Sequence, residues 1–304
     1  KVDLVTLDLI ENALKNARWE MDAVLFRTAM SPGIREQHDE FPMIANNVAK
    51  MVVGQFGSFI YGFINGYNGD IEEGDIFLTN DPYECRGAIS HLPDWLVLQP
   101  IYFEHRVISW SAMFGHMTDI GGKVPGSLPV DANQIYEEGI MIPPTKIYRK
   151  GKLNKEVLDL ILHNCRLPHW NRADFNALIA GLRTAERRCI EIAERFGVDI
   201  YIEAMEQMLD RNKRAMSAII KMVIPEKKAY FEDYICDDGI GTGPYKIACS
   251  VERKGDVAYF DFTGTDPQSK SSINFYLNEE MFKMFLGAFT INIFDPQILF
   301  NDGF

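Results

Sequence analysis

A predicted β-hairpin constrains the fold of this chain more than any other feature of the sequence. Two runs rich in β-branched and aromatic residues, 95–103 and 106–114, lie on either side of a short break at 104–105. Such residues favour strands, and the break is typical of a hairpin turn. If the turn is centred on this break, paired residue numbers add up to about 209, which places Asp94 opposite Gly115. The hairpin therefore brings the segments that flank it together at its open end.

A His-x-x-Asp motif lies on each side of the hairpin, His91 to Asp94 before it and His116 to Asp119 after it. Two neutral imidazoles and a carboxylate suit one divalent ion, and zinc, manganese and iron all accept such ligands. His91, Asp94 and His116 form the leading ligand set. Asp119 and Asp81 offer either a further ligand or a hydrogen-bond partner that orients an imidazole, and both roles stay open. The alternative is a group of ordinary hydrogen-bonded polar side chains at a sheet edge.

A glycine-rich segment follows the second motif directly. Gly121, Gly122 and Gly126 allow a close backbone approach and can form an anion-binding nest, to which Lys123 adds a positive charge. A plain glycine turn explains the same residues. Arg166, between two predicted helices, could hold a carboxylate, phosphate or bicarbonate, or could cap the carbonyls at the end of the first helix. The segment lacks the spacing of a phosphate-binding P-loop, so no ATP site is predicted on this chain.

Composition excludes several classes of partner. With 304 residues, of which 47% are hydrophobic, the chain can bury a large core and is expected to hold more than one domain. A net charge of −12 argues against nucleic acid and anionic membrane surfaces as partners. Five widely spaced cysteines predict neither a disulfide framework nor a thiolate zinc site, which favours the cytoplasm. No apolar stretch approaches the roughly 20 residues that cross a bilayer.

The sequence divides by pattern into three parts and predicts an α+β fold. Residues 1–150 combine a long N-terminal helix with a β-rich domain that carries the metal motifs. Residues 151–224 form a helical segment, and residues 225–304 a second β region that ends in an apolar helix. Since the chain begins without Met and ends on an apolar run, we expect it to be an incomplete piece of a longer subunit. The predicted helices span about 3–30, 154–164, 174–196, 199–222 and 278–294, and the strands of the second β region about 228–235, 245–252 and 256–263.

With these residues identified, the chain resembles the B-type subunits of the hydantoinase, oxoprolinase and ketone carboxylase superfamily. Within it, the insert 84–89 and the single imidazole at His116 look more like acetophenone carboxylase than like hydantoinase, whose members tend to carry a His-His pair there. The matching motifs are Gly74-Asp75, Asn80-Asp81-Pro82-Tyr83, His91-Leu92-Pro93-Asp94, His116, Asp119-Ile120-Gly121-Gly122, Pro125-Gly126-Ser127, Glu138-Gly139, Ile142-Pro143-Pro144, Asn164-Cys165-Arg166 and Asp261-Phe262-Thr263-Gly264-Thr265.

The resemblance implies one subunit of an ATP-driven hetero-oligomer whose A-type, hydantoinase A-like partner binds ATP. It implies the carboxylation of a ketone, in which an enolate formed from the activated ketone attacks carbon dioxide derived from bicarbonate. By match to related carboxylases, His91, Asp94 and His116 hold one divalent metal ion, and we expect Lys123 and Arg166 to hold anions. The first alternative is ATP-dependent hydrolysis of a cyclic amide, such as a hydantoin, oxoproline or lactam. The second is a structural subunit whose metal only staples the hairpin.

Overall fold

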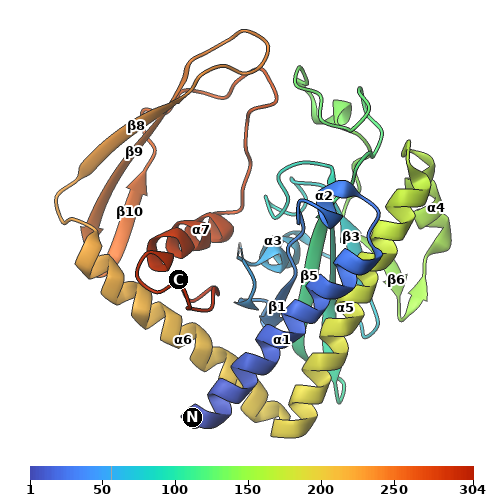
Figure 1. Cartoon of the computed structure of the whole chain (residues 1–304), viewed down its shortest axis with the longest axis vertical. Helices are drawn as coiled ribbons and strands as arrows, with labels where there is room; N and C mark the ends of the chain where they lie inside the picture. Colours follow the sequence, from blue (N-terminus) through green and yellow to red (C-terminus); the bar gives the residue numbers. More distant parts are fainter. Residues whose placement is uncertain (56) are drawn as a thin grey trace.

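The predicted α+β class is confirmed by the computed structural model, which describes residues 1–55 and 57–304 (Figure 1). Its main element is a seven-stranded sheet with the strand order β2-β1-β5-β4-β3-β6-β7, in which every neighbouring pair is antiparallel. The strands are β1 (Met43–Asn46), β2 (Met51–Val53), β3 (Ile76–Thr79), β4 (Asp94–Phe103), β5 (Arg106–His116), β6 (Thr145–Arg149) and β7 (Lys152–Leu153).

Both faces of the central strands of this sheet are buried, which explains their nearly continuous apolar runs. In β4, Trp95 and Val97 join one hydrophobic cluster, whereas Leu96 and Leu98 join another on the opposite face. Successive side chains of a strand point to opposite faces, so this division follows from the strand geometry. The first cluster includes residues of α1 (Leu4–Thr28), α4 (Lys155–His163), α5 (Pro168–Phe196) and α6 (Val198–Val223), and the second those of α3 (Phe59–Gly66) and α7 (Glu279–Asn292).

A register shift in the β4-β5 hairpin corrects the predicted pairing at its open end. Near the turn the strands follow the predicted register, but the pairing moves by one residue between Ile101 and Tyr102. One strand of the pair therefore has an extra residue, which is a β-bulge. As a result Asp94 lies opposite His116, and not opposite Gly115 as predicted.

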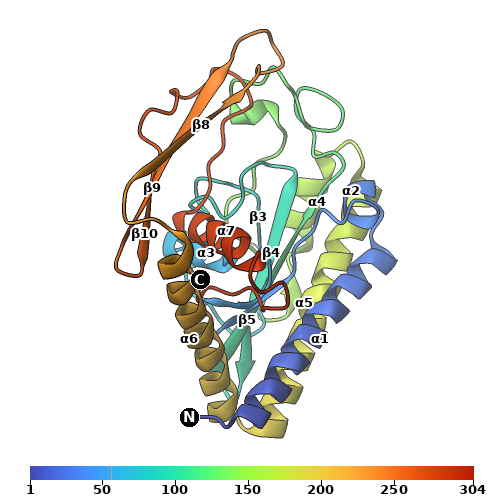
Figure 2. The same ribbon diagram turned by 60° about the vertical axis from the view of Figure 1, so that its left-hand side comes forward.

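A second, three-stranded sheet follows α6 and has the order β10-β9-β8. Figures 1 and 2 show α7 between this sheet and the seven-stranded sheet. Every residue of β8 is exposed, including Tyr230 and Phe231.

Among the described residues no helix is long and apolar enough to span a membrane. The domain boundaries at 150 and 224 stay predictions. The strands are β8 (Ala229–Ile235), β9 (Tyr245–Lys254) and β10 (Val257–Asp261), and two short helices elsewhere are α2 (Pro32–Arg35) and η1 (Ile135–Glu137).

Candidate metal centre

The open end of the β4-β5 hairpin brings three predicted ligands together. The ring nitrogen Nδ1 of His116 lies 2.9 Å from Oδ1 of Asp94, and Nε2 of His91 lies 3.2 Å from the same oxygen. The two ring nitrogens are 3.4 Å apart. His91, Asp94 and His116 are thus the residues that could hold a metal ion in the described part of the chain.

The local fold explains why these three side chains meet. Asp94 is the first residue of β4 and His116 the last residue of β5, and the register makes them a cross-strand pair. Directly opposed residues of an antiparallel pair point to the same face of the sheet. His91 precedes β4 in a loop whose position is fixed by the buried side chain of Asn80, because Asn80 donates to the Leu92 carbonyl at 2.7 Å.

The donor geometry fits a metal ion. Three donors about 2.1 Å from one tetrahedral ion lie about 3.4 Å from one another, close to the distances found here. A hydrogen bond between the two imidazole nitrogens needs a proton on one of them, whereas an ion accepts lone pairs from both. The side chain of His91 is 38% exposed and that of Asp94 only 8%, so the group is open to solvent on the side of His91.

Carboxylates at the cluster give it a negative electrostatic potential, which favours a bound cation. Burial alone would raise the pKa of Asp94, but hydrogen bonds from His116 and His91 outweigh it and hold the pKa below its ordinary value. Burial would also lower the pKa of His91, but the hydrogen bond and charge of Asp94 raise it. Ser90 Oγ lies 3.1 Å from Nδ1 of His91, on the ring nitrogen that does not face the cluster. Such a partner orients a ligand ring.

Asp39 is a site residue that the sequence motifs did not reveal. Its Oδ2 lies 3.7 Å from Nδ1 of His116, so it offers a further oxygen to the same space. Strand β1 pairs with β5, and the bridge between Glu40 and Gly115 extends this pairing until Asp39 lies beside His116. The sequence signal was weak, a polar run at 35–40 between a helix and a strand, because the pairing of β1 with β5 joins distant segments.

Asp119 lies apart from the three ligands and serves the glycine-rich segment. Its Oδ1 accepts from the Gly121 amide at 2.9 Å and its Oδ2 from the Gly126 amide at 2.8 Å. Arg166 Nη1 reaches the same carboxylate at 3.2 Å. Burial would raise the pKa of Asp119, but the two amides and Arg166 hold it below its ordinary value. The predicted anion nest therefore contains a carboxylate of this chain itself.

The glycine carbonyls, in turn, face Arg166. Its guanidinium donates to the carbonyls of Gly121 at 3.0 Å, Gly122 at 2.6 Å and Val124 at 3.0 Å. Gly121 and Gly122 have φ values of 91° and 80°, which few other residues adopt. A Cβ atom on Gly122 would meet the Glu137 carbonyl at 2.5 Å. Arg166 thus ties together a loop whose path requires glycine.

The two remaining predicted site residues also have partners within the chain. Lys123 Nζ lies 2.7 Å from Asp131 and 3.1 Å from Glu137. Asp81 accepts hydrogen bonds from the amides of Tyr83 and Glu84 at 2.9 and 3.1 Å, so it shapes the turn after β3. Roles of these residues toward an external ligand stay predictions.

Comparison with known proteins places this site in a family context. A model of the family described as hydantoinase B/oxoprolinase matches residues 3–304. The beta chain of the caprolactamase of Pseudomonas jessenii is 31% identical over 99% of this chain and 52% of its own length. The B-type chain of the putative D-/L-hydantoinase of Pseudomonas sp. strain NS671 is 30% identical over 88% of this chain and 48% of its own length. The chain thus spans about half the length of these relatives.

The same comparison extends to a solved structure and corrects one expectation. The crystal structure of the ATP-dependent caprolactamase from P. jessenii superposes with a TM-score of 0.84 and 29% identity, over 97% of this chain and 51% of that one. The acetophenone carboxylase delta subunit of Aromatoleum aromaticum is 28% identical over 74% of this chain and 34% of its own length. The expected special nearness to acetophenone carboxylase is therefore not supported, since caprolactamase matches better on identity and on coverage.

Proposed function

The chain belongs to the hydantoinase B/oxoprolinase family, and we propose on this basis that it is the metal-binding part of an ATP-dependent enzyme that hydrolyses a cyclic amide. The observation that carries the proposal is the convergence of His91, Asp94 and His116 in a chain that is similar along nearly its whole length to the beta chain of a caprolactamase. From the sequence alone this function ranked second, behind ketone carboxylation. The matched relatives now support it better than the first choice.

Each residue of the centre has a separate task in this proposal. His91, Asp94 and His116 hold a divalent ion, and Asp39 supplies a further oxygen. When bound, such an ion supplies a Lewis acid beside the amide carbonyl. Ser90 fixes the ring of His91 by its hydrogen bond to Nδ1, which leaves Nε2 directed at the cluster. ATP binds to a partner chain, consistent with the absence of a P-loop motif from this sequence.

Ketone carboxylation remains the second candidate function because one specific observation favours it. The acetophenone carboxylase delta subunit shares 28% of the residues over the matched region. The same ligands would serve that reaction, since an enolate oxygen and an amide carbonyl oxygen both accept a Lewis acid. The two functions differ in their co-substrate, because only the carboxylase consumes bicarbonate.

The test combines the full-length protein with its ATP-binding partner. We expect caprolactam or hydantoin to be opened only when ATP is present, at a rate that does not depend on bicarbonate, as measured by mass spectrometry of the product. Fixation of labelled bicarbonate into a ketone without any ring opening would contradict the proposal and favour the carboxylase.

A histidine variant separates catalysis from a structural metal. His116→Ala should abolish turnover and leave the assembly intact, whereas His105→Ala at the exposed hairpin tip should have no effect. Dissociation of the assembly or loss of the fold in His116→Ala alone would instead support a metal that only staples the hairpin.

A further inference from the structure

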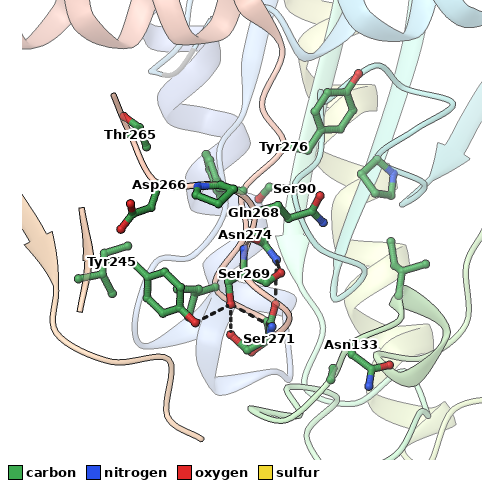
Figure 3. Close-up of a pocket in the computed structure, with 18 of the residues that line it drawn as sticks. Ser90, Asn133, Tyr245, Thr265, Asp266, Gln268, Ser269, Ser271, Asn274 and Tyr276 are labelled. Atoms are coloured by element: carbon green, nitrogen blue, oxygen red, sulfur yellow. Dashed lines mark hydrogen bonds between the residues drawn. The ribbon is translucent and has the colours of Figure 1, made fainter. Parts of the chain in front are cut away.

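A cavity of about 860 Å³ lies between the segment 265–276 and the loops that precede β4 and follow β5 (Figure 3). Ser90 and Asn133 contribute to it from the loops, and Gln268 from the segment. In Figure 3 the side chain of Gln268 projects away from the hydrogen-bonded turn of Ser269 and Asn274. The cavity is within the size range of small-molecule sites and much larger than one unsubstituted ring requires.

The cavity adjoins the metal centre through two of its lining residues. Ser90 lines the cavity and also touches the ring of His91, 3.1 Å from Nδ1. Glu138 lines the cavity, and its Oε2 accepts from the Leu92 amide at 3.3 Å. The cavity thus begins beside the ring of His91, on its Nδ1 side.

The charges around the cavity disfavour an anionic ligand. Among the described lining residues, Glu138 and Asp266 are acidic and Lys246 alone is basic. Lys246 lies on β9 and lines the cavity together with these two acidic residues, so the described lining has one more negative than positive charge. A carboxylate in this cavity would meet two carboxylates and one ammonium among these residues, a balance that disfavours a further negative charge.

The remaining lining suits a neutral ring with an apolar substituent. The carboxamides of Gln268 and Asn133 can each donate and accept a hydrogen bond, which suits uncharged polar groups of a substrate other than the amide that reacts at the metal centre. The apolar part of the cavity contains Phe262 and Phe282, whose rings lie edge to face with centroids 5.6 Å apart. Ile247 of β9 lies in the same lining. Aromatic walls of this kind bind apolar groups.

We propose that this cavity binds the body of a neutral cyclic amide that carries an apolar substituent, and that it rejects rings that carry a carboxylate. The inference rests on the proposed function, because the ring is opened at the neighbouring metal centre. It goes further by choosing among cyclic amides: a 5-aryl hydantoin is expected to be a far better substrate than 5-oxoproline.

The first experiment compares three rings in the full-length protein assembled with its ATP-binding partner. We expect kcat/KM for 5-benzylhydantoin to exceed that for 5-oxoproline by about 100-fold, and that for unsubstituted hydantoin by about tenfold. Equal or better turnover of 5-oxoproline would overturn the inference.

Two variants test the two walls separately. Phe282→Ala should reduce the ratio of kcat/KM for 5-benzylhydantoin to that for hydantoin by about tenfold. Phe289→Ala is the matched control, since Phe289 lies on the same helix, is 61% exposed and does not line the cavity. Gln268→Lys adds a cation and should raise kcat/KM for 5-oxoproline about tenfold, whereas Gln297→Lys, outside the cavity, should not. If neither cavity variant differed from its control, the cavity would not be the substrate site.

A binding measurement separates this inference from the proposed function. The affinity of the assembly for 5-benzylhydantoin is measured by calorimetry without ATP, in the Phe282→Ala and Phe289→Ala variants. If no ring is opened but Phe282→Ala alone weakens binding, the proposed function fails and the cavity assignment stands. If 5-benzylhydantoin does not bind, the cavity assignment fails whatever the reaction is.

Discussion

Replacement of Arg166 by alanine should destabilise the protein and leave His91, Asp94 and His116 in place. In the structure Arg166 holds the buried carboxylate of Asp119 and three loop carbonyls at once. Alanine leaves the carboxylate with the amides of Gly121 and Gly126 but without a counter-ion. From the sequence, Arg166 was expected instead to hold an anionic ligand, so the variant distinguishes two roles.

The magnitude follows from the burial of the two partners. Removal of one partner from a buried ion pair costs about 3–5 kcal/mol. The side chain of Asp119 is only 4% exposed but that of Arg166 is 41% exposed, so solvent screening reduces the expected loss to about 2–3 kcal/mol. For a chain of 304 residues, whose unfolding entropy is about 0.6 kcal/mol/K, such a loss lowers Tm by about 3–5 °C.

Thermal unfolding followed by circular dichroism measures the effect, with the metal content determined on the same samples. Arg172→Ala is the matched control, because Arg172 is equally exposed and pairs at 2.6 Å with Asp159, itself 45% exposed. We expect the control to cost less than about 1 kcal/mol. If Arg166→Ala unfolded like the wild type, kept its metal and still lost all turnover, the structural role would be refuted and the ligand-binding role supported.

Three further predictions concern the centre, one ion pair and the glycine loop. Ser90→Ala should weaken metal affinity by about 10–100-fold in a competition with a chelator, and unchanged affinity would show that Ser90 does not orient His91. Asp75→Asn should destabilise the protein by about 2 kcal/mol at pH 7, since it removes the buried partner of Lys146 and leaves that ammonium with the exposed Asp70 alone. Burial would raise the pKa of Asp75 but Lys146 and backbone amides hold it below 3.8, so this stability is present above pH 3.8 and is lost as the pH falls through the lowered pKa. The difference in the free energy of unfolding between wild type and Asp75→Asn should therefore shrink as the pH falls below 3.8. A difference that stays constant with pH would contradict this role of Asp75. Gly122→Ala should destabilise the protein more than Gly126→Ala, because a Cβ atom at Gly122 would meet the Glu137 carbonyl at 2.5 Å. A Cβ atom at Gly126 would meet no atom within 4 Å, so Gly126→Ala should cost only about 1 kcal/mol in urea unfolding.

The helices and most of the strands were predictable because their apolar spacing is local. The predicted helix at 199–222 is observed as Val198–Val223, and the predicted strand at 228–235 as Ala229–Ile235. The helix predicted from 174 begins earlier, at Pro168, because proline fits the first turn of a helix. The segment 41–66 was predicted only as β-rich, and its helix α3 was missed.

The convergence of His91, Asp94 and His116 was predictable for the same reason, since one hairpin joins the segments that carry them. The exact pairing was not, because a single extra residue in a strand leaves no clear mark in composition. Contacts between distant segments were also hidden from the sequence. Asp39 reaches His116 only through the pairing of β1 with β5, and Arg166 meets Asp119 across 47 residues.

The β-bulge between Ile101 and Tyr102 also divides the hairpin into two parts, the tip and the open end, with different registers. Seven residue pairs separate it from the pair of Asp94 with His116, and the alignment of the two ligands depends on that stretch alone. The tip at Glu104 and His105 lies beyond the bulge, where both residues already have positive φ values and are exposed. A peptide tag or a fluorophore inserted at this tip should leave the ligands aligned, whereas one extra residue between the bulge and Asp94 would turn the carboxylate to the opposite face of the sheet. The tip is thus a suitable attachment point for probes that report on the folded protein.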